Sequence, residues 1–190
     1  TSSTMITAFN SNGFSVGTND DVGANNTEYV TWTFRKEPKF FDIVTYTGTG
    51  SAQAISHSLN STVGMIAVKR TDTTGNWAVY HRGANGGTDP EDYHAGFNLT
   101  DEFANNAGYW NDTAPTTTQF TVGDDNNVNA NSGTYVAYLF AHNNSDGGFG
   151  PDSEDIIKCG YYTGNNSTTG PIVNLGFEPQ WLFIKHTDAA

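Results

Sequence analysis

The chain has 190 residues, enough for one large β-sandwich or about two domains of ordinary size. Aromatic residues make up 13% of it and are spread along its length, which argues against a disordered chain. With 8 Lys plus Arg against 20 Asp plus Glu, the formal net charge is −12, which excludes the basic surface that nucleic-acid binding requires. No segment approaches the roughly 20 apolar residues that span a bilayer, and residues 1–9 lack the features of a signal peptide.

Short runs rich in aromatic and β-branched residues predict about ten strands. Residues 29–34 are typical, because Val30, Trp32 and Phe34 alternate with more polar neighbours and would share one face of a strand. The predicted strands are residues 29–34, 40–46, 65–69, 77–81, 97–99, 120–122, 135–140, 156–162, 172–175 and 181–185. Clusters of Gly, Asn, Asp and Pro separate them, and only residues 101–107 suggest a short helix. This spacing predicts an all-β fold made of antiparallel β-sandwich or jelly-roll domains.

The chain contains an internal repeat. Phe14–Gly17 returns as Phe120–Gly123, and Tyr29–Phe34 returns as Tyr135–Phe140, both 106 residues further on. The two copies therefore continue in step through a turn-rich stretch of Asp, Asn and Gly.

Further along the chain the offset grows to 116 residues. Ile66–Asp72 then matches Leu182–Asp188, and Tyr46–Gly48 matches Tyr162–Gly164. The extra length is accommodated in the polar, glycine-rich loop at residues 142–154, where an insertion costs little.

These matches predict tandem domains with an internal repeat of about 105 residues. Residues 1–40 would be the C-terminal part of one repeat unit, residues 41–141 a complete β-sandwich unit, and residues 142–190 the N-terminal part of the next. Two half-sandwich repeats that fold together are the alternative interpretation. We favour tandem domains because only the central unit contains the segment 77–115, and we expect the chain to be part of a longer protein.

The order of seven sequence blocks resembles the tandem domains of virion structural and tail-fibre-like proteins from phages that infect marine and aquatic bacteria. The blocks are residues 29–36, 41–48, 55–59, 64–70, 77–81, 135–141 and 175–181. The resemblance implies a repetitive β-sandwich building block of a virion, in long proteins that often also carry lectin-like domains. It implies no catalytic residues. One departure is that residues 60–63 lack the Gly and Pro present in the second copy as Gly176 and Pro179.

An aromatic cluster is the candidate glycan-binding site. Tyr109, Trp110, Asn111 and Asp112 combine aromatic faces with the amide and carboxylate groups that recognise sugars. Trp77, Tyr80 and His81 would extend such a surface. Burial in the core is the competing interpretation of these aromatic residues, and it is the favoured one for Trp77.

Acidic residues in loops are candidate Ca²⁺ ligands. They are Asp124, Asp125, Asp152 and Asp155. None of them lies in an EF-hand pattern, and solvated acidic turns are the ordinary explanation. We therefore expect no cofactor, with Ca²⁺ as the one alternative left open.

The histidines and the single cysteine carry no recognisable chemistry in sequence. His57, His81, His94, His142 and His186 form no closely spaced ligand pair. Cys159 is the only cysteine, so an internal disulfide is excluded, and we expect it to be a small buried residue. No carboxylate pair stands out either, since Asp42 adjoins an apolar strand and the pair at 101–102 would cap a helical turn.

The sequence therefore predicts a non-enzymatic structural protein of a phage virion, in a tail fibre or another external appendage. Its stacked β-domains would act as a spacer and as an adhesin for host-surface glycans, with avidity from repetition. The expected partners are other virion proteins and further copies of the chain itself. By analogy with fibres, this homo-oligomer would be a trimer. We expect neither nucleic-acid binding nor membrane insertion. A secreted bacterial glycan-binding or glycan-cleaving β-sandwich module is the alternative.

Overall fold

The computed structural model describes residues 5–188. The chain folds as two compact units whose boundary in the sequence lies between Phe34 and Arg35. Strands in antiparallel sheets dominate both units, and each described α-helix has four residues. The predicted all-β fold class with antiparallel sheets is confirmed at this level.

The first unit contains a hairpin and one helical turn. Strands β1 (Ile6–Asn10) and β2 (Gly13–Val16) pair in antiparallel fashion, and helix α1 (Asp20–Gly23) follows. Asn19 caps α1, because its side-chain oxygen accepts a hydrogen bond from the Asp21 amide at 2.9 Å. The two aspartates of the first turn place negative charge beside the positive end of the helix dipole, which stabilises the helix.

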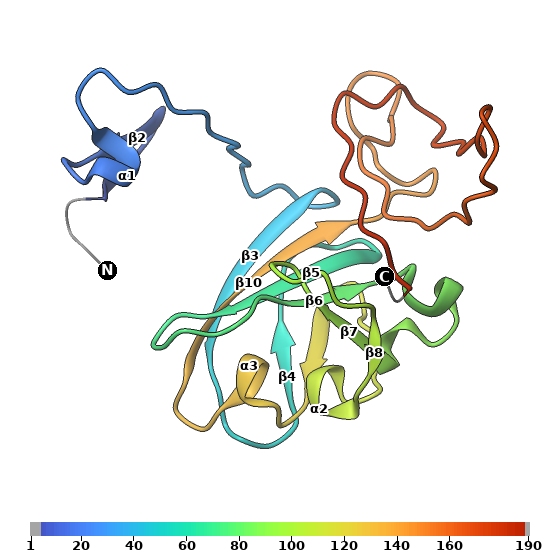
Figure 1. Ribbon diagram of the computed structural model, residues 1–190, viewed down its shortest axis with the longest axis horizontal. Coiled ribbons are helices and arrows are strands. Elements are labelled where there is room, and N and C mark those ends of the chain that lie inside the picture. The colour runs from blue at the N-terminus through green and yellow to red at the C-terminus, as the bar shows by residue number, and fades with distance from the viewer. Residues whose placement is uncertain (1–4, 189–190) are drawn as a thin grey trace. The chain divides into compact units, whose positions relative to one another are not determined.

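A six-stranded antiparallel sheet forms the body of the second unit (Figure 1). Its strands, in spatial order, are β3 (Phe41–Thr47), β10 (Thr134–Ala141), β5 (Val63–Arg70), β6 (Ala78–His81), β7 (Tyr93–Gly96) and β8 (Ala104–Asn105). The last of these strands in the sequence, β10, lies between β3 and β5 and pairs with both. The sheet therefore depends on contacts between residues almost 100 positions apart.

A second, two-stranded sheet lies against one face of the larger sheet. It consists of β4 (Gln53–Ser56) and β9 (Gln119–Val122), which pair in antiparallel fashion. Helices α2 (Ala107–Trp110) and α3 (Asn126–Asn129) lie beside it at the same side of the sheet (Figure 1). Two 3₁₀ turns, η1 (Ala84–Gly87) and η2 (Pro90–Asp92), connect β6 to β7.

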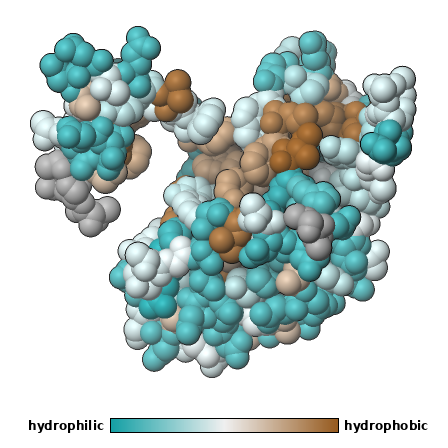
Figure 2. Space-filling view, viewed as in Figure 1, coloured by the Kyte–Doolittle hydropathy of each residue, from teal (hydrophilic) through white to brown (hydrophobic). Residues whose placement is uncertain are grey.

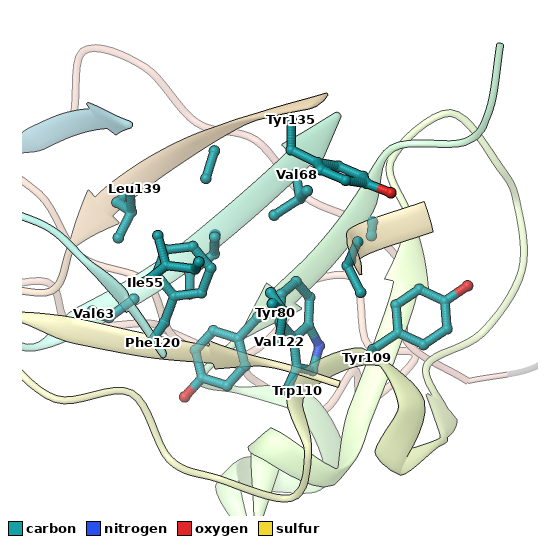
Figure 3. Packing of buried hydrophobic residues seen from close by; sticks show 14 of the residues in the cluster. Ile55, Val63, Val68, Tyr80, Tyr109, Trp110, Phe120, Val122, Tyr135 and Leu139 are labelled. Atoms are coloured by element: carbon teal, nitrogen blue, oxygen red, sulfur yellow. The ribbon is translucent and has the colours of Figure 1, made fainter. Parts of the chain in front are cut away.

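The hydrophobic core fills the space between these two layers (Figure 3). Alternation along β10 places Tyr135 and Leu139 in the core, and both are at most 1% exposed. Phe120 and Val122 of β9 face them from the other layer. Burying a large side chain of this kind stabilises a fold by about 1.5–3 kcal/mol. Packing between β9 and β10 therefore holds the two layers together.

The opposite face of the large sheet is also apolar. The rings of Phe41 and Phe140 pack 5.1 Å apart, and the Phe41 ring stacks on Tyr138 at 6.4 Å. Trp77 packs on Tyr138 at 5.7 Å between centroids. Both faces of the central strands therefore carry aromatic side chains.

Several predicted strands are confirmed. The predictions at 40–46, 65–69, 77–81, 120–122 and 135–140 correspond to β3, β5, β6, β9 and β10. All strands of the large sheet lie within residues 41–141, while the predicted boundaries of the repeat units stay a prediction.

Other local predictions are wrong. Residues 29–34, 97–99, 156–162, 172–175 and 181–185 have strand-like sequences but form no strand. A strand needs a hydrogen-bonded neighbour, and alternation in the sequence does not supply one. The helix suggested at 101–107 is also wrong, because this stretch contains β8 and only the first residue of α2.

The same local structure occurs twice, 106 residues apart. Helices α1 and α3 both have four residues, and Asn19 and Asp125 cap them from equivalent positions. An alanine with nearly the same backbone angles caps the C-terminus of each helix, Ala24 with φ −61° and ψ 141° and Ala130 with φ −56° and ψ 139°. The likeness of these two segments therefore extends from sequence to backbone geometry.

No helix among residues 5–188 combines the length and the apolar character that a membrane span requires.

Candidate functional site

The predicted glycan-binding residues lie on and after helix α2. Asn106 caps this helix by accepting a hydrogen bond from the Gly108 amide at 2.9 Å. Asn111 and Asp112 follow it with positive φ angles of 54° and 44° and are exposed. Asn111 serves as the left-handed C-cap, a conformation that Asn tolerates better than most residues.

Trp110 belongs to the core. Its side chain is 1% exposed, and its indole Nε1 donates to the Tyr93 carbonyl at 3.1 Å. Its ring meets Tyr80 edge-on with centroids 6.1 Å apart (Figure 3). The expectation of a sugar-stacking face at Trp110 is corrected, because the indole is enclosed by protein and its polar atom is satisfied.

Tyr109 lies at the margin of the core and is 9% exposed. Its ring stacks on His94 with centroids 3.5 Å apart and an interplanar angle of 6°. Its hydroxyl accepts a hydrogen bond from Asn127 Nδ2 at 3.1 Å. One ring face of Tyr109 is therefore already occupied by the imidazole.

A small pocket opens beside this stacked pair and forms the candidate functional site. Its volume is about 100 Å³. Its lining includes Trp77, His94, Asp101, Glu102, Tyr109 and Asn127. Such a volume admits a few water molecules or one substituent of a larger ligand, so a sugar would lie across the opening rather than inside it.

Burial and one carboxylate determine the charges at this pocket. Burial lowers the pKa of His94, and the nearby Asp125 carboxylate only partly offsets this effect. Burial also raises the pKa of the Tyr109 hydroxyl, and Asp125 acts in the same direction. At neutral pH the pocket therefore combines a neutral imidazole and a neutral phenol with the exposed carboxyl groups of Asp101 and Glu102.

This set of groups is suited to binding. The stacked rings of His94 and Tyr109 supply aromatic surface, and the Asn127 amide and the two carboxyl groups supply hydrogen-bonding atoms. Aromatic surface beside amides and carboxylates is the composition that recognises sugar hydroxyls. Of the four predicted residues the structure brings only Tyr109 to this pocket, whereas His94, Asp101, Glu102 and Asn127 were not predicted as site residues.

Two of the four Ca²⁺ candidates have structural roles. Asp125 caps α3 by accepting from the Asn127 amide at 2.8 Å. Asp155 accepts from the amides of Ser145 and Gly147 at 2.7 and 2.9 Å, and these bonds lower its carboxyl pKa. Both carboxylates close local turns.

The other two candidates, Asp124 and Asp152, are exposed. Among residues 5–188, no three His, Cys, Asp or Glu side chains gather in a way that could hold a metal ion. The four aspartates therefore do not form one common site in this part of the chain.

A second polar cluster joins the sheet to the segment after the polar loop. The Arg82 guanidinium lies 3.2 Å from His142 Nε2 and donates to the Cys159 carbonyl at 3.4 Å. The Cys159 amide donates to His142 Nδ1 at 3.2 Å. Burial, followed by the Arg82 charge, lowers the pKa of His142, and the same two causes with His142 lower the pKa of His81 to about 4.

The hydrogen bonds from Arg82 and to His142 connect the Cys159 backbone to the end of the large sheet. Cys159 is half-buried rather than fully buried as expected, and desolvation raises the pKa of its thiol to about 12. No spacing in the sequence could have indicated the cluster, because Arg82 follows β6, His142 follows β10 and Cys159 lies in a later loop.

Comparison with known proteins gives one match. The model of a domain of unknown function, DUF7483, matches residues 1–190. No curated protein and no solved structure matches the chain.

Proposed function

The chain belongs to the DUF7483 family of domains of unknown function, and from its own residues we propose that it is a non-enzymatic structural module of a phage particle. It would form part of a tail fibre or another external appendage, with stacked β-sandwich domains as a spacer. The observation that carries the proposal is the repeated local structure around Tyr29 and Tyr135.

The two tyrosines make the same contacts in their own segments. The Tyr29 hydroxyl donates to the Asp20 carbonyl at 2.6 Å and accepts from the Ala24 amide at 3.1 Å. The Tyr135 hydroxyl donates to the Asn126 carbonyl at 2.8 Å and accepts from the Ala130 amide at 2.7 Å. Equal contacts 106 residues apart support a duplicated unit of about 105 residues, and repetition of such a unit would lengthen an appendage.

The surface chemistry agrees with an exposed particle component. A net charge of −12 opposes contact with nucleic acid and favours solubility at the high local concentration of a stalk. The resemblance of the seven sequence blocks to tail-fibre-like proteins gives the place in the particle, and that part of the proposal rests on the resemblance alone.

The pocket beside Tyr109 is the surface through which the same module would take part in host attachment. One shallow site of this size would bind a surface glycan weakly, but a repeated appendage presents many copies, and their avidity exceeds the single-site affinity. The contact would be made by the stacked rings of His94 and Tyr109 and by the carboxyl groups of Asp101 and Glu102.

Particle membership can be tested by labelling. Antibodies raised against residues 35–188 should bind purified particles of a phage that encodes the protein, and gold-labelled antibody should mark tail appendages in electron micrographs. Detection only in the culture supernatant of uninfected bacteria would refute the proposal and favour the secreted glycan-binding or glycan-cleaving module.

Glycan binding needs a separate measurement. A glycan array and a host-cell binding assay on the purified chain should give a signal that the Glu102→Ala variant, changed at an exposed residue of the pocket, loses. Asn131→Ala, which changes an exposed residue outside the pocket, is the matched control. Equal signals from the two variants would remove the pocket from the proposal and leave the spacer role.

A further inference from the structure

A second pocket lies where the described chain ends, and it is larger than the pocket beside Tyr109. Its volume is about 260 Å³, compared with about 100 Å³ for the pocket beside Tyr109. We call it the C-terminal pocket, and its lining is Asn85, Gly86, Tyr93, Glu102, Phe103, Thr187 and Asp188. This volume is below that of a pocket for a drug-sized ligand and suits a single sugar ring.

Two contacts hold the C-terminal wall of this pocket in place. The Phe103 amide donates a hydrogen bond to the Thr187 carbonyl at 3.1 Å. The rings of Phe97 and Phe183 stack with centroids 5.2 Å apart and an interplanar angle of 7°. The last described residues are therefore attached to the loop between β7 and β8, and the pocket is part of the second unit.

The two pockets lie on opposite sides of the pair formed by β7 and β8. Successive residues of a strand point to opposite faces, and Tyr93 lines the C-terminal pocket whereas His94 lines the other one. Glu102, two residues before β8, lines both. The C-terminal pocket is therefore a separate site.

The C-terminal pocket carries uncompensated negative charge. The carboxylates of Glu102 and Asp188 are exposed and form no hydrogen bond or ion pair with residues 5–188. No Lys or Arg of this part of the chain lines the pocket, and the nearby Lys185 donates instead to the Leu99 carbonyl at 3.0 Å. Figure 2 shows mainly hydrophilic surface where Figure 1 draws the end of the chain beside the green turns. The pocket therefore favours a ligand that brings a positive charge.

The rest of the lining suits a sugar. Tyr93 and Phe103 are its aromatic residues, and both are half-buried. Beside them lie the Thr187 hydroxyl and the Asn85 amide, whose nitrogen donates to the Thr88 carbonyl at 2.9 Å. Aromatic residues beside amide and hydroxyl groups are the composition that recognises sugars, and an aromatic face also attracts a cation.

We propose that the C-terminal pocket binds an amino sugar, a sugar ring that carries a free ammonium group. The ammonium group would lie between the carboxylates of Glu102 and Asp188, and the ring would pack against Tyr93 and Phe103. The inference goes beyond the proposed function, because it adds a second site and a ligand class that the pocket beside Tyr109 does not define.

The size of the pocket favours an amino sugar over a lysine side chain. Both present an ammonium group, but a lysine side chain is a thin, flexible chain that would leave much of the volume unfilled. A sugar ring fills more of it and also brings hydroxyl groups to the polar part of the lining. A sugar acid would be repelled by the two carboxylates.

The test compares two disaccharides that differ only in charge. They are the disaccharide of glucosamine and its fully N-acetylated form, titrated into the purified chain in a calorimeter. A pH of about 6 keeps the amino groups charged, and an ionic strength of about 0.15 M screens the general attraction of cations to an acidic chain. The amino disaccharide should bind at least tenfold more tightly. Equal affinities, or no binding of the amino form, would overturn the proposal.

Asp188→Asn removes one charge of the pocket without touching the core, because Asp188 is exposed. It should reduce the preference for the amino disaccharide to less than threefold. Glu178→Gln is the matched control, since it removes one exposed charge outside the lining and should leave the preference unchanged. Equal effects of the two variants would mean that net charge alone attracts the ligand, and would overturn the proposal.

Two further measurements assign the pocket and the ligand class. Asp101 lines only the pocket beside Tyr109, so Asp101→Asn should leave binding of the amino disaccharide unchanged. A loss with Asp101→Asn that Asp188→Asn does not cause would overturn the assignment to the C-terminal pocket. N-acetyl-lysine amide should bind at least tenfold more weakly than the amino disaccharide, and equal binding would refute recognition of the sugar.

This test is independent of the proposed function. A chain that is absent from phage particles, or that gives no signal with host cells, can still bind the amino disaccharide. Conversely, labelled particles together with equal affinities for the two disaccharides would retain the proposed function and refute the second site.

Discussion

Tyr29 and Tyr135 hold their own helical turns in the same way, each through a hydroxyl that donates to the carbonyl nine residues earlier and accepts from the amide five residues earlier. The surroundings differ, because Tyr29 is 42% exposed and Tyr135 is 1% exposed. One contact is open to solvent, and its counterpart is sealed in the core. The pair therefore provides a comparison of one hydrogen-bonding pattern at two degrees of burial.

Tyr135→Phe should lower the free energy of unfolding of the large sheet by about 2 kcal/mol, because it leaves the buried Ala130 amide without its acceptor. Tyr29→Phe is the matched control and should change the main unfolding transition by no more than about 0.5 kcal/mol, since water replaces the lost hydroxyl. Urea denaturation followed by tryptophan fluorescence measures both. Equal losses in the two variants would contradict the assigned role of burial.

Asn129 joins two loops to the core and should not tolerate truncation. Its side chain is fully buried. The side-chain oxygen accepts hydrogen bonds from the Thr49 backbone amide and the Gln53 side-chain amide. The side-chain nitrogen donates to the carbonyls of Ser51 and Gly123. Asn129→Ala should destabilise the protein by about 3 kcal/mol, because several buried polar groups lose partners together.

Asn131→Ala, two residues away and exposed, is the control for Asn129→Ala and should be neutral within about 0.5 kcal/mol. Thermal unfolding by differential scanning calorimetry distinguishes the two variants. A small effect of Asn129→Ala on the unfolding temperature would show that water replaces the hydrogen bonds that these loops lose.

Asp42 should make the stability depend on pH in the acid range. Its side chain is 3% exposed, and burial alone would raise its pKa. The Lys36 ammonium at 2.6 Å and the amides of Ser58 and Ile43 outweigh burial, so the pKa is lowered. A lowered folded-state pKa gives stability that is present above the unfolded value of about 3.9 and is lost as the pH falls through the folded value.

Asp42→Asn should therefore cost about 2 kcal/mol at neutral pH and less as the pH falls below about 4. Asp72→Asn is the control, because Asp72 pairs with Arg70 at 2.7 Å at the surface, where ion pairs contribute little. Chemical denaturation across the acid range provides the measurement. A stability difference for Asp42→Asn that does not change with pH would contradict the assignment.

Cys159 should resist alkylation in the folded protein. Burial raises its pKa to about 12, so only a minute fraction is thiolate at neutral pH. Its Sγ also lies 3.6 Å from the Ala141 carbonyl. Iodoacetamide should label the native chain at least a hundredfold more slowly than the urea-unfolded chain. Similar rates would mean that the segment around Cys159 separates readily from the residues that it contacts.

Sequence patterns predicted the centre of the fold well. Alternation at residues 135–140 corresponds to β10, in which Tyr135 and Leu139 point into the core. The same alternation at residues 29–34 forms no strand, because periodicity reports which residues suit a strand and not which neighbours are present. Whether a hydrogen-bonded neighbour is present therefore determines which of these two similar segments forms a strand.

The candidate site was less predictable. Trp110 lies near a Gly/Asn loop in the sequence, yet its indole is buried and bonded to Tyr93. His94 lines the pocket and stacks on Tyr109 because β7 and α2 lie next to each other in the fold. Spacing along the chain carries no information on such long-range juxtapositions.

The central position of β10 also has a consequence for synthesis. Strands β3 and β5 emerge first from the ribosome, but the strand that joins them ends at Ala141. At typical translation rates this delay lasts on the order of ten seconds. During that time the apolar faces of β3 and β5 are on a nascent chain without their shared neighbour, so chaperone capture and pairing with adjacent nascent chains compete with folding until residue 141 is available.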